Sequence, residues 1–394
     1  MVETEVQKER VILVGVSEQD GDDTKDSLEE LKELVATAGA VTEGMVIQNR
    51  ERIHPGTYVG TGKVSEIKEM LATTGATGIV CDDELSPAQM KNLEDLLDTK
   101  VMDRTLVILD IFAAHASTSE GKIQVELAQL RYSMTRLAGF GRSMSRLGGG
   151  IGTRGPGEKK LEMDKRIIRT RISQLKRELA EVKKHREVAR GQRMRNHVPV
   201  AAIVGYTNAG KSTLLNHLTH AGVLEEDKLF ATLDPTTRQL ELPGKQQILL
   251  TDTVGFIRKL PHHLIEAFKS TLEEAKYADF IIHVVDASNP QAAKQMHIVY
   301  ETLHQLEVTD KKILTLFNKQ DAITDREPLR DGRADITLRV SAARGDGLEE
   351  LKDCLARILR ENKRYLETVL PYDKGGLLQQ IRETGELIAE EYLP

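Results

Sequence analysis

The sequence has no tryptophan, two cysteines and few aromatic side chains of any kind. Aromatic residues make up 4% of the 394 positions, so we expect hydrophobic cores built mainly from leucine, isoleucine and valine. Cys81 and Cys354 are too few for a disulfide framework, and they lack the spacing of a metal site. This cysteine usage is typical of a reducing cytosol and excludes a disulfide-stapled scaffold.

Long apolar runs are also missing. The strongest one, FIIHVV at 280–285, is far too short to cross a bilayer, and the charged N-terminus lacks the apolar core of a signal peptide. We therefore expect a cytoplasmic protein with no membrane span, and peripheral membrane contact stays open.

Basic residues concentrate in one segment of a chain whose formal net charge is −6. Residues 131–197 carry 19 lysines and arginines against 6 acidic residues, a net charge of +13, while the remainder carries −19. This segregation predicts one surface that meets a polyanion.

Residues 1–115 alternate short apolar runs with amphipathic stretches, which predicts a small N-terminal α/β domain with a mostly parallel sheet. The predicted strands span 11–16, 41–48 and 77–83, and the predicted helices span 27–39, 64–75 and 86–97. Ser86 and Pro87 supply an N-cap and a first-turn proline for the last helix. The glycine-rich stretch HPGTYVGTGK at 54–63 fits either a structural or partner-contact loop or a second nucleotide site, although its spacing departs from a phosphate-binding loop.

Residues 116–197 have the pattern of an antiparallel helical hairpin, because two heptad-like apolar stripes flank a glycine-rich turn. The stripes are Ile123, Leu127, Leu130, Met134 and Leu137, and Ile168, Ile172, Leu175, Leu179 and Val182. We expect the second helix to run from about Glu158 to about Arg195, which at ~1.5 Å per residue exceeds ~50 Å.

The turn of this hairpin, residues 141–160, combines glycines with cations. Six glycines lie between 148 and 157, where the missing side chains let the backbone approach a partner closely. Only two aromatics, Tyr132 and Phe140, fall within 131–197, so phosphate contacts suit the segment better than base stacking. The predicted RNA-contacting residues are Arg142, Arg146, Arg154, Lys159 and Lys160.

From 198 to 363 the chain again alternates strand and helix, with the spacing of a doubly wound sheet. The predicted strands span 198–205, 247–252, 279–287, 312–319 and 336–342. Residues 364–394 form a short C-terminal segment, in which we expect a strand, a turn and a short helix.

GYTNAGKS at 205–212 matches the pattern GxxxxGK[ST] between an apolar strand and a helix. Its glycines would let backbone N–H groups close around phosphates, while Lys211 reaches the β- and γ-phosphates and Ser212 coordinates Mg²⁺. Further on, DTVG at 252–255 follows another strand and suits a Mg²⁺-linked carboxylate and an amide that senses the γ-phosphate.

NKQD at 318–321 ends a later strand. Asp321 can accept hydrogen bonds from the N1–H and N2 amino groups of guanine, a pairing that adenine does not offer, and Asn318 and the stem of Lys319 would brace the base. SAARGDG at 341–347 would add a backbone N–H for guanine O6. In this order the four motifs resemble the translation-factor-related class of P-loop GTPases.

LFATLDPTTR at 229–238 lies between the first two motifs, where a switch segment is expected. A threonine there would complete the Mg²⁺ shell when the γ-phosphate is present. On chemistry alone, Thr232, Thr236 and Thr237 all qualify.

LFATLDPTTR, DTVGFIRKLP and the hairpin turn GGGIGTRGPGEKKLE together resemble the HflX family of ribosome-associated GTPases, over essentially the whole chain. The resemblance implies that Thr232 is the Mg²⁺-binding switch threonine and that residues 230–234 line the nucleotide. It also implies that the partner is the large ribosomal subunit and that the activity separates stalled ribosomes, notably under heat stress. The expected nucleotide-binding residues are Gly205, Tyr206, Thr207, Asn208, Ala209, Gly210, Lys211, Ser212, Phe230, Ala231, Thr232, Leu233, Asp234, Asp252, Thr253, Val254, Gly255, Asn318, Lys319, Gln320, Asp321, Ser341, Ala342 and Ala343.

Phe256 stands where a Ras-like enzyme has a glutamine that orients the attacking water, so the sequence identifies no catalytic residue. Either Phe256 packs near the switch while another internal group places the water, or hydrolysis stays slow until a partner orders the site. Such a partner contribution can be worth ~10³–10⁵ in rate.

The sequence thus predicts an α/β protein with four parts: the N-terminal domain, the helical hairpin, a P-loop GTPase domain and a short tail. We expect a monomeric, Mg²⁺-dependent GTPase that the ribosome stimulates and that splits or rescues stalled ribosomes. One alternative is an NTP-driven RNA helicase or chaperone with a second nucleotide site in the N-terminal domain. Another is a signalling GTPase that acts on a protein effector.

Overall fold

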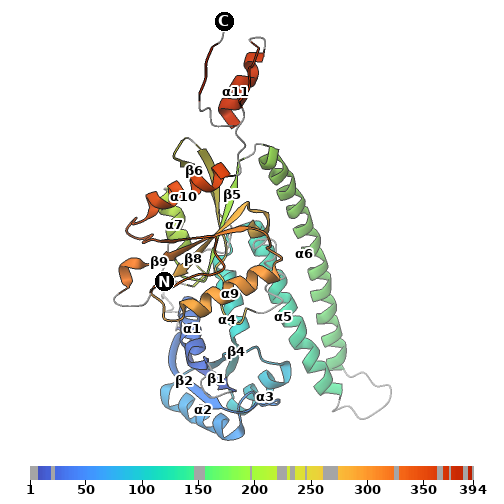
Figure 1. Cartoon of the computed structure of the whole chain (residues 1–394). Coiled ribbons are helices and arrows are strands. Elements are labelled where there is room, and N and C mark those ends of the chain that lie inside the picture. The colour runs from blue at the N-terminus through green and yellow to red at the C-terminus, as the bar shows by residue number, and fades with distance from the viewer. Residues whose placement is uncertain are drawn as a thin grey trace, which may run out of the picture. The chain divides into compact units, whose positions relative to one another are not determined.

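The computed structural model divides into two compact units (Figure 1). The first comprises residues 1–183, 226–234 and 257–270, and the second comprises the rest of the chain. The structure describes residues 8–18, 23–145, 156–195, 198–219, 229–230, 236–244, 246–260, 274–323, 328–361, 367–371, 374–384 and 389–392.

The first unit contains a four-stranded parallel sheet of order β2-β1-β3-β4. Its strands are β1 (Arg10–Ser17), β2 (Val41–Asn49), β3 (Gly78–Cys81) and β4 (Lys100–Asp103). Seven of the eight residues of β1 are buried, as expected for a central parallel strand covered on both faces. The predicted α/β class and the three predicted strands are confirmed, and β4 was not predicted.

Four helices accompany this sheet: α1 (Thr24–Thr37), α2 (Thr61–Thr74), α3 (Pro87–Leu97) and α4 (Arg104–His115). The predicted start of α3 is confirmed, because the Ser86 hydroxyl accepts from Gln89 N at 3.2 Å and Gln89 Oε1 accepts from Ser86 N at 2.9 Å. These reciprocal bonds form a capping box. Helix α4 was not predicted; its N-cap is Asp103, whose side chain accepts from Leu106 N at 3.0 Å.

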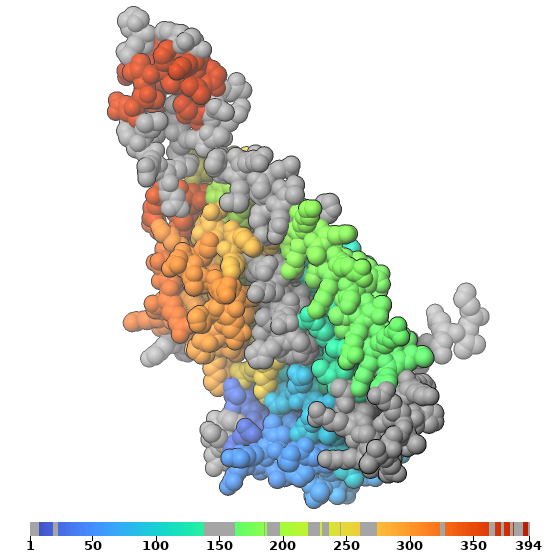
Figure 2. Space-filling model, turned by 90° about the vertical axis from the view of Figure 1, so that its right-hand side faces the viewer, coloured from blue at the N-terminus to red at the C-terminus, as the bar shows by residue number. Residues whose placement is uncertain are grey.

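Two long helices form the predicted hairpin, α5 (Ser119–Ser145) and α6 (Pro156–Arg195). Their shared apolar cluster consists of residues from both predicted stripes: Leu127, Ile172 and Leu175, with Ile123, Leu130, Met134, Ile168 and Leu179 packed against them. Arg171 of α6 also pairs with Glu126 of α5, at 2.6 and 2.8 Å. Figure 2 shows the green side chains of α6 as a strip on the surface, where Met163 and Ile167 are 64% and 61% exposed.

The second unit contains a six-stranded sheet of order β10-β9-β8-β5-β7-β6. Its strands are β5 (Val200–Gly205), β6 (Thr236–Leu242), β7 (Gln246–Asp252), β8 (Phe280–Asp286), β9 (Lys312–Asn318) and β10 (Ile336–Arg339). All neighbours are parallel except the edge pair β6 and β7. The five predicted strands are confirmed, and the antiparallel edge strand β6 was not predicted.

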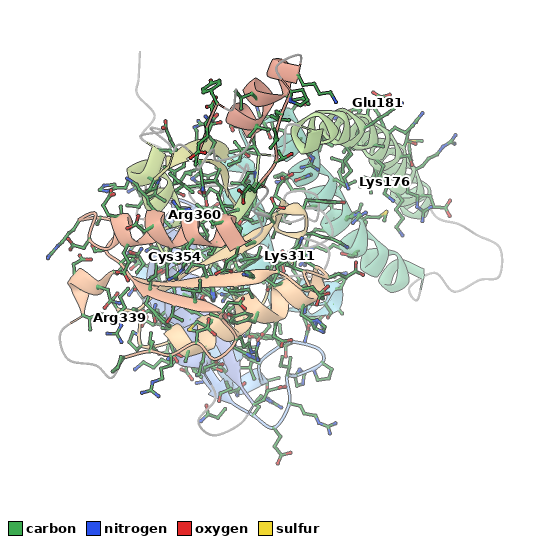
Figure 3. All side chains as sticks on the ribbon, turned by 45° about the horizontal axis from the view of Figure 1, so that its top comes forward. Lys176, Glu181, Lys311, Arg339, Cys354 and Arg360 are labelled. Atoms are coloured by element: carbon green, nitrogen blue, oxygen red, sulfur yellow. The ribbon has the colours of Figure 1, made fainter. Side chains whose placement is uncertain are left out.

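The helices of the second unit include α7 (Lys211–Thr219), α9 (Ala292–Gln305), α10 (Leu348–Glu361) and α11 (Gly375–Thr384). In Figure 3, α10 lies across one face of the sheet and carries the labelled Cys354 and Arg360. Its buried side chains join those of α7 and the central strands in one core, which includes Leu214, Ile203, Ile282 and Leu355. The scarcity of aromatics is thus compatible with a core of aliphatic side chains, as expected.

Two details of the chain ends and surfaces complete the fold. The described residues 367–371 form no strand, so the strand expected there is wrong for those residues, whereas the short helix is present as α11. Across the described ranges, every helix is too short or too polar to serve as a membrane span. The four-part domain division stays a prediction.

Candidate nucleotide site

The P-loop joins β5 to α7 at the carboxyl edge of the six-stranded sheet, where ligands bind in open α/β folds. Gly210 has φ +93°, and a Cβ on it would lie 2.3 Å from Asn318 Nδ2. Only glycine suits this position, because any side chain would meet both backbone strain and a collision. The P-loop at Gly210 therefore packs directly against the Asn318 side chain of the NKQD motif.

Asn318 links three of the predicted motifs. It is 2% exposed; its Nδ2 donates to Ala209 O at 2.9 Å, and its Oδ1 accepts from Ala342 N at 2.8 Å. The P-loop, NKQD and SAARGDG are thus held together by one buried amide. The bracing of a guanine base by Asn318 stays a prediction.

Lys211 lies beneath the loop and is 6% exposed. Its Nζ donates to Tyr206 O at 2.9 Å. Burial lowers the pKa of Lys211 to about 8, and the nearby Asp252 carboxylate offsets only part of that effect. An ammonium group in such a place is stabilised by phosphate oxygens, which supply the negative charge that the buried site lacks.

Ser212 and Asp252, the residues predicted to lie near Mg²⁺, are in direct contact. Ser212 Oγ donates to Asp252 Oδ2 at 2.7 Å, and Asp252 is fully buried. Within the described ranges no cluster of three or more His, Cys, Asp or Glu side chains could hold a metal. The pair instead fits Mg²⁺, which commonly takes one or two protein oxygens and completes its shell with phosphates and water.

The segment after DTVG runs alongside the P-loop. Thr207 N donates to Phe256 O at 2.8 Å, and Phe256 N donates to Gly205 O at 3.1 Å. The Phe256 side chain is 2% exposed, so its ring belongs to the core. A buried phenyl ring does not hold the attacking water, which is common to both interpretations of Phe256.

Asp321 is the residue predicted to recognise guanine. Its Oδ1 accepts from Ser341 Oγ at 2.6 Å, and this bond, with smaller contributions from Arg344 and Lys319, lowers the pKa of the carboxyl. Lys319 Nζ pairs with Asp286 Oδ2 at 2.8 Å, which fixes the lysine stem across the loop. The carboxylate remains an acceptor for two N–H donors.

The switch threonines separate into two groups. Thr236 and Thr237 lie on β6, where they pair in register with Asp252 and Thr251, and the Thr237 hydroxyl bonds that of Thr251 at 3.0 Å. The assignment of a threonine as cation ligand stays a prediction. Thr232 lies outside the described residues, together with Ala231, Leu233 and Asp234.

Phe230 falls in the first unit. Its ring packs edge to face on Phe112 of α4, with 4.7 Å between centroids, and the residue is 3% exposed. The described contacts of Phe230 are therefore those of a core residue.

The predicted RNA-contacting residues surround the hairpin turn. Arg146 and Arg154 lie outside the described residues, while Arg142 is on α5 and Lys159 and Lys160 are on α6, in stretches whose side chains are not described. Further along α6, Lys176 and Glu181 are exposed and labelled in Figure 3.

Sequence reasoning missed two cations directly after the DTVG motif. Arg258 pairs with Asp23 at 2.7 Å, and Lys259 pairs with Asp82 at 2.5 Å and Asp83 at 2.6 Å. Burial acts to lower the pKa of Lys259, but the two carboxylates outweigh it and the pKa is raised. The sequence does show a basic dipeptide, Arg258-Lys259, and an acidic dipeptide, Asp82-Asp83, but neither dipeptide indicates its partner.

Backbone N–H groups of the glycine-rich loop at 54–63 donate to side-chain acceptors within the first unit. The backbone N–H groups of Gly56 and Thr57 donate to His54 Nδ1 at 3.2 and 3.1 Å, and Gly60 N donates to Gln48 Oε1 at 2.8 Å. The Tyr58 side chain is buried and donates to Asp83 at 2.6 Å. These contacts favour the structural interpretation over a phosphate-binding loop.

The fold and the four motifs define a P-loop GTPase, and three family models match successive parts of the chain. Their descriptions are GTP-binding GTPase N-terminal for residues 25–113, GTP-binding GTPase Middle Region for 115–193 and 50S ribosome-binding GTPase for 200–319.

Curated relatives cover nearly the whole chain. The chain is 67% identical over 392 residues to GTPase HflX of Lacrimispora saccharolytica, covering 100% of this chain and 93% of the relative. It is 42% identical over 372 residues to GTPase HflX of Escherichia coli, covering 94% and 87%. Among solved structures, it resembles SsGBP in complex with GDP, with a TM-score of 0.50 and 26% identity, covering 89% of this chain and 99% of that one. The chain belongs to the HflX family of GTPases, and it hydrolyses GTP.

Proposed function

We propose that this GTPase binds the large ribosomal subunit through its helical hairpin and uses its GTP cycle to separate stalled ribosomes under stress. The observation that carries the proposal is a long basic hairpin in the same chain as a GTPase fold. The family model that matches residues 200–319 is described as a 50S ribosome-binding GTPase, which supports the same partner.

The hairpin suits a structured RNA. Helix α6 has 40 residues, which at ~1.5 Å per residue gives ~60 Å. Such a rod can carry charge deep into a folded particle, where lysines and arginines neutralise phosphates. We assign the RNA contacts to Arg142, Arg146, Arg154, Lys159 and Lys160 around the glycine-rich turn.

We assign a role to each motif of the nucleotide site. Residues 205–212 would hold the phosphates, Asp321 would accept from guanine, and Gly255 would contact the γ-phosphate. Ser212 and Thr232 would hold Mg²⁺, which neutralises charge on the β- and γ-phosphates when bound. Asp252 orients the Ser212 hydroxyl through their 2.7 Å bond.

The segment after DTVG supports a partner-dependent reaction. Phe256 is hydrogen-bonded to the P-loop and its ring is buried, so it supplies no group that holds the attacking water by a strong hydrogen bond. We therefore infer that hydrolysis stays slow until the docked ribosome orders the site.

The helicase alternative would require a nucleotide site in the N-terminal domain. The loop at 54–63 gives it no support, because the described N–H groups of Gly56, Thr57 and Gly60 already have internal acceptors. ATP binding that survives Lys211→Ala would revive this alternative.

The test is ribosome separation itself. Intact ribosomes are mixed with the protein and GTP, and free subunits are measured by sucrose-gradient sedimentation. We expect wild type to release subunits, and the triple variant Arg142→Glu, Arg146→Glu, Arg154→Glu to bind and release far less. The matched control carries the same charge change on exposed lysines of α1 and α2, namely Lys25→Glu, Lys32→Glu and Lys68→Glu. Equal activity of both triple variants would contradict the proposal.

A further inference from the structure

Thr207, the third residue of the P-loop motif, carries a buried hydroxyl that has no hydrogen-bond partner among the described residues. The residue is 6% exposed, and its Oγ1 is shielded from solvent. A hydroxyl buried in this way costs free energy, and native proteins usually pair such groups. An orphaned hydroxyl inside a binding loop therefore points to a ligand.

The position of this side chain identifies the part of the ligand. A Cβ placed on Gly255 would lie 2.8 Å from Thr207 Cγ2, 2.9 Å from Thr207 Cα and 3.0 Å from Lys211 Nζ. The Thr207 side chain thus lies at the point where the DTVG glycine and the P-loop lysine meet. In P-loop GTPases these two groups hold the γ-phosphate.

Other hydroxyls of these motifs are already engaged. Ser212 Oγ donates to Asp252 at 2.7 Å, and Thr253 Oγ1 donates to Ile203 O at 2.8 Å. The Phe256 ring is buried and has no group that holds water by a strong hydrogen bond. Among the described residues of the P-loop and DTVG motifs, Thr207 carries a buried hydroxyl that is left without a hydrogen-bond partner.

We propose that the Thr207 hydroxyl holds the attacking water against the γ-phosphate, the task that residue 256 does not perform. A hydroxyl oxygen accepts hydrogen bonds, so Thr207 Oγ1 accepts from the water and leaves a lone pair of that water directed at the γ-phosphorus. The water oxygen forms a bond to the γ-phosphorus while the bond from that phosphorus to the β–γ bridging oxygen breaks. The proton of the water ends on inorganic phosphate, and Thr207 remains a neutral hydroxyl throughout.

The test compares Thr207→Val, which keeps the shape and removes the hydroxyl, with Thr207→Ser, which keeps the hydroxyl. Single-turnover GTP hydrolysis is measured for the full chain without ribosomes, alongside the affinities for GDP and a slowly hydrolysed GTP analogue. We expect Thr207→Val to lose about tenfold to a hundredfold in rate, as misplacement of a reactant does, with both affinities within about twofold of wild type. Thr207→Ser should keep the rate within about threefold.

A stability measurement separates this role from a structural one. Because Thr207→Val removes an unpaired buried hydroxyl, the Tm of the nucleotide-free protein should rise or stay unchanged while hydrolysis falls. An unchanged rate in Thr207→Val would overturn the proposal. So would equal losses in the valine and serine variants, or a loss of GTP-analogue affinity that matches the loss of rate.

Discussion

Replacing Asn318 by alanine tests whether one buried amide holds the nucleotide site together. The change removes two hydrogen bonds at once, to Ala209 O at 2.9 Å and from Ala342 N at 2.8 Å. Both bonds join elements far apart in the sequence. Because the side chain is 2% exposed, water cannot easily replace it.

The magnitude follows from what the substitution leaves behind. Each buried backbone group left without a partner costs ~1–3 kcal/mol, so the two together cost about 2–6 kcal/mol. The loss is shared between the stability of the second unit and its affinity for nucleotide. At 1.4 kcal/mol per factor of ten, the lower figure alone corresponds to about a 30-fold weaker Kd if it falls on binding.

Urea unfolding of the nucleotide-free protein measures the loss of stability, and titration with a fluorescent GDP analogue measures the loss of nucleotide affinity. Thr302→Ala is the matched control, since the Thr302 hydroxyl donates only to Ile298 O within α9, at 2.8 Å. We expect the control to stay near wild type in both assays. If Asn318→Ala changes the Kd by less than about threefold and the unfolding free energy by less than about 0.5 kcal/mol, the reasoning is refuted.

Two further predictions concern ionisable groups. Burial lowers the pKa of His283 to about 4, and the Asp331 carboxylate, 3.9 Å away, only partly opposes this. Between pH 4 and 6.5 the His283 side chain is therefore protonated in the unfolded chain but neutral in the folded protein. The unfolding free energy should rise by up to ~3 kcal/mol from pH 4 to 6.5. His283→Leu should flatten that part of the pH profile measured by urea unfolding, and an unchanged slope would contradict the assignment. Lys259→Ala removes one of two cations that pair with the buried Asp82, the other being Arg104 at 2.8 Å, and should lower the stability of the first unit by about 1–3 kcal/mol. Lys276→Ala breaks an exposed pair with Glu307 and should cost below ~1 kcal/mol, so equal losses in the two lysine variants would refute the distinction.

The features that the sequence predicted well are set by local patterns. The capping box at Ser86 and Gln89 spans three residues, and the P-loop is a continuous segment between a strand and a helix. The hairpin stripes were predicted because a heptad repeat shows in the sequence which faces of α5 and α6 pack together.

The features that were missed depend on distant parts of the chain. Lys259 and Asp82 are separated by 177 positions, and nothing near either residue identifies the other. Strand β6 was not predicted because an edge strand with one buried face carries a weak apolar signal, and because its start was assigned to the switch segment. The unpaired state of the Thr207 hydroxyl likewise appears only when the loop is folded against Gly255.

If the basic hairpin docks on the large ribosomal subunit as we propose, docking should raise the rate of GTP hydrolysis. The most direct measurement is steady-state GTP hydrolysis with and without purified large subunits, for wild type and for a chain lacking residues 148–157. We expect at least a tenfold stimulation of wild type, a low bound against the ~10³–10⁵ that a partner can supply, and none for the deletion, with equal rates for both proteins alone. Fast hydrolysis that is indifferent to the subunits, or full stimulation of the deletion, would contradict it.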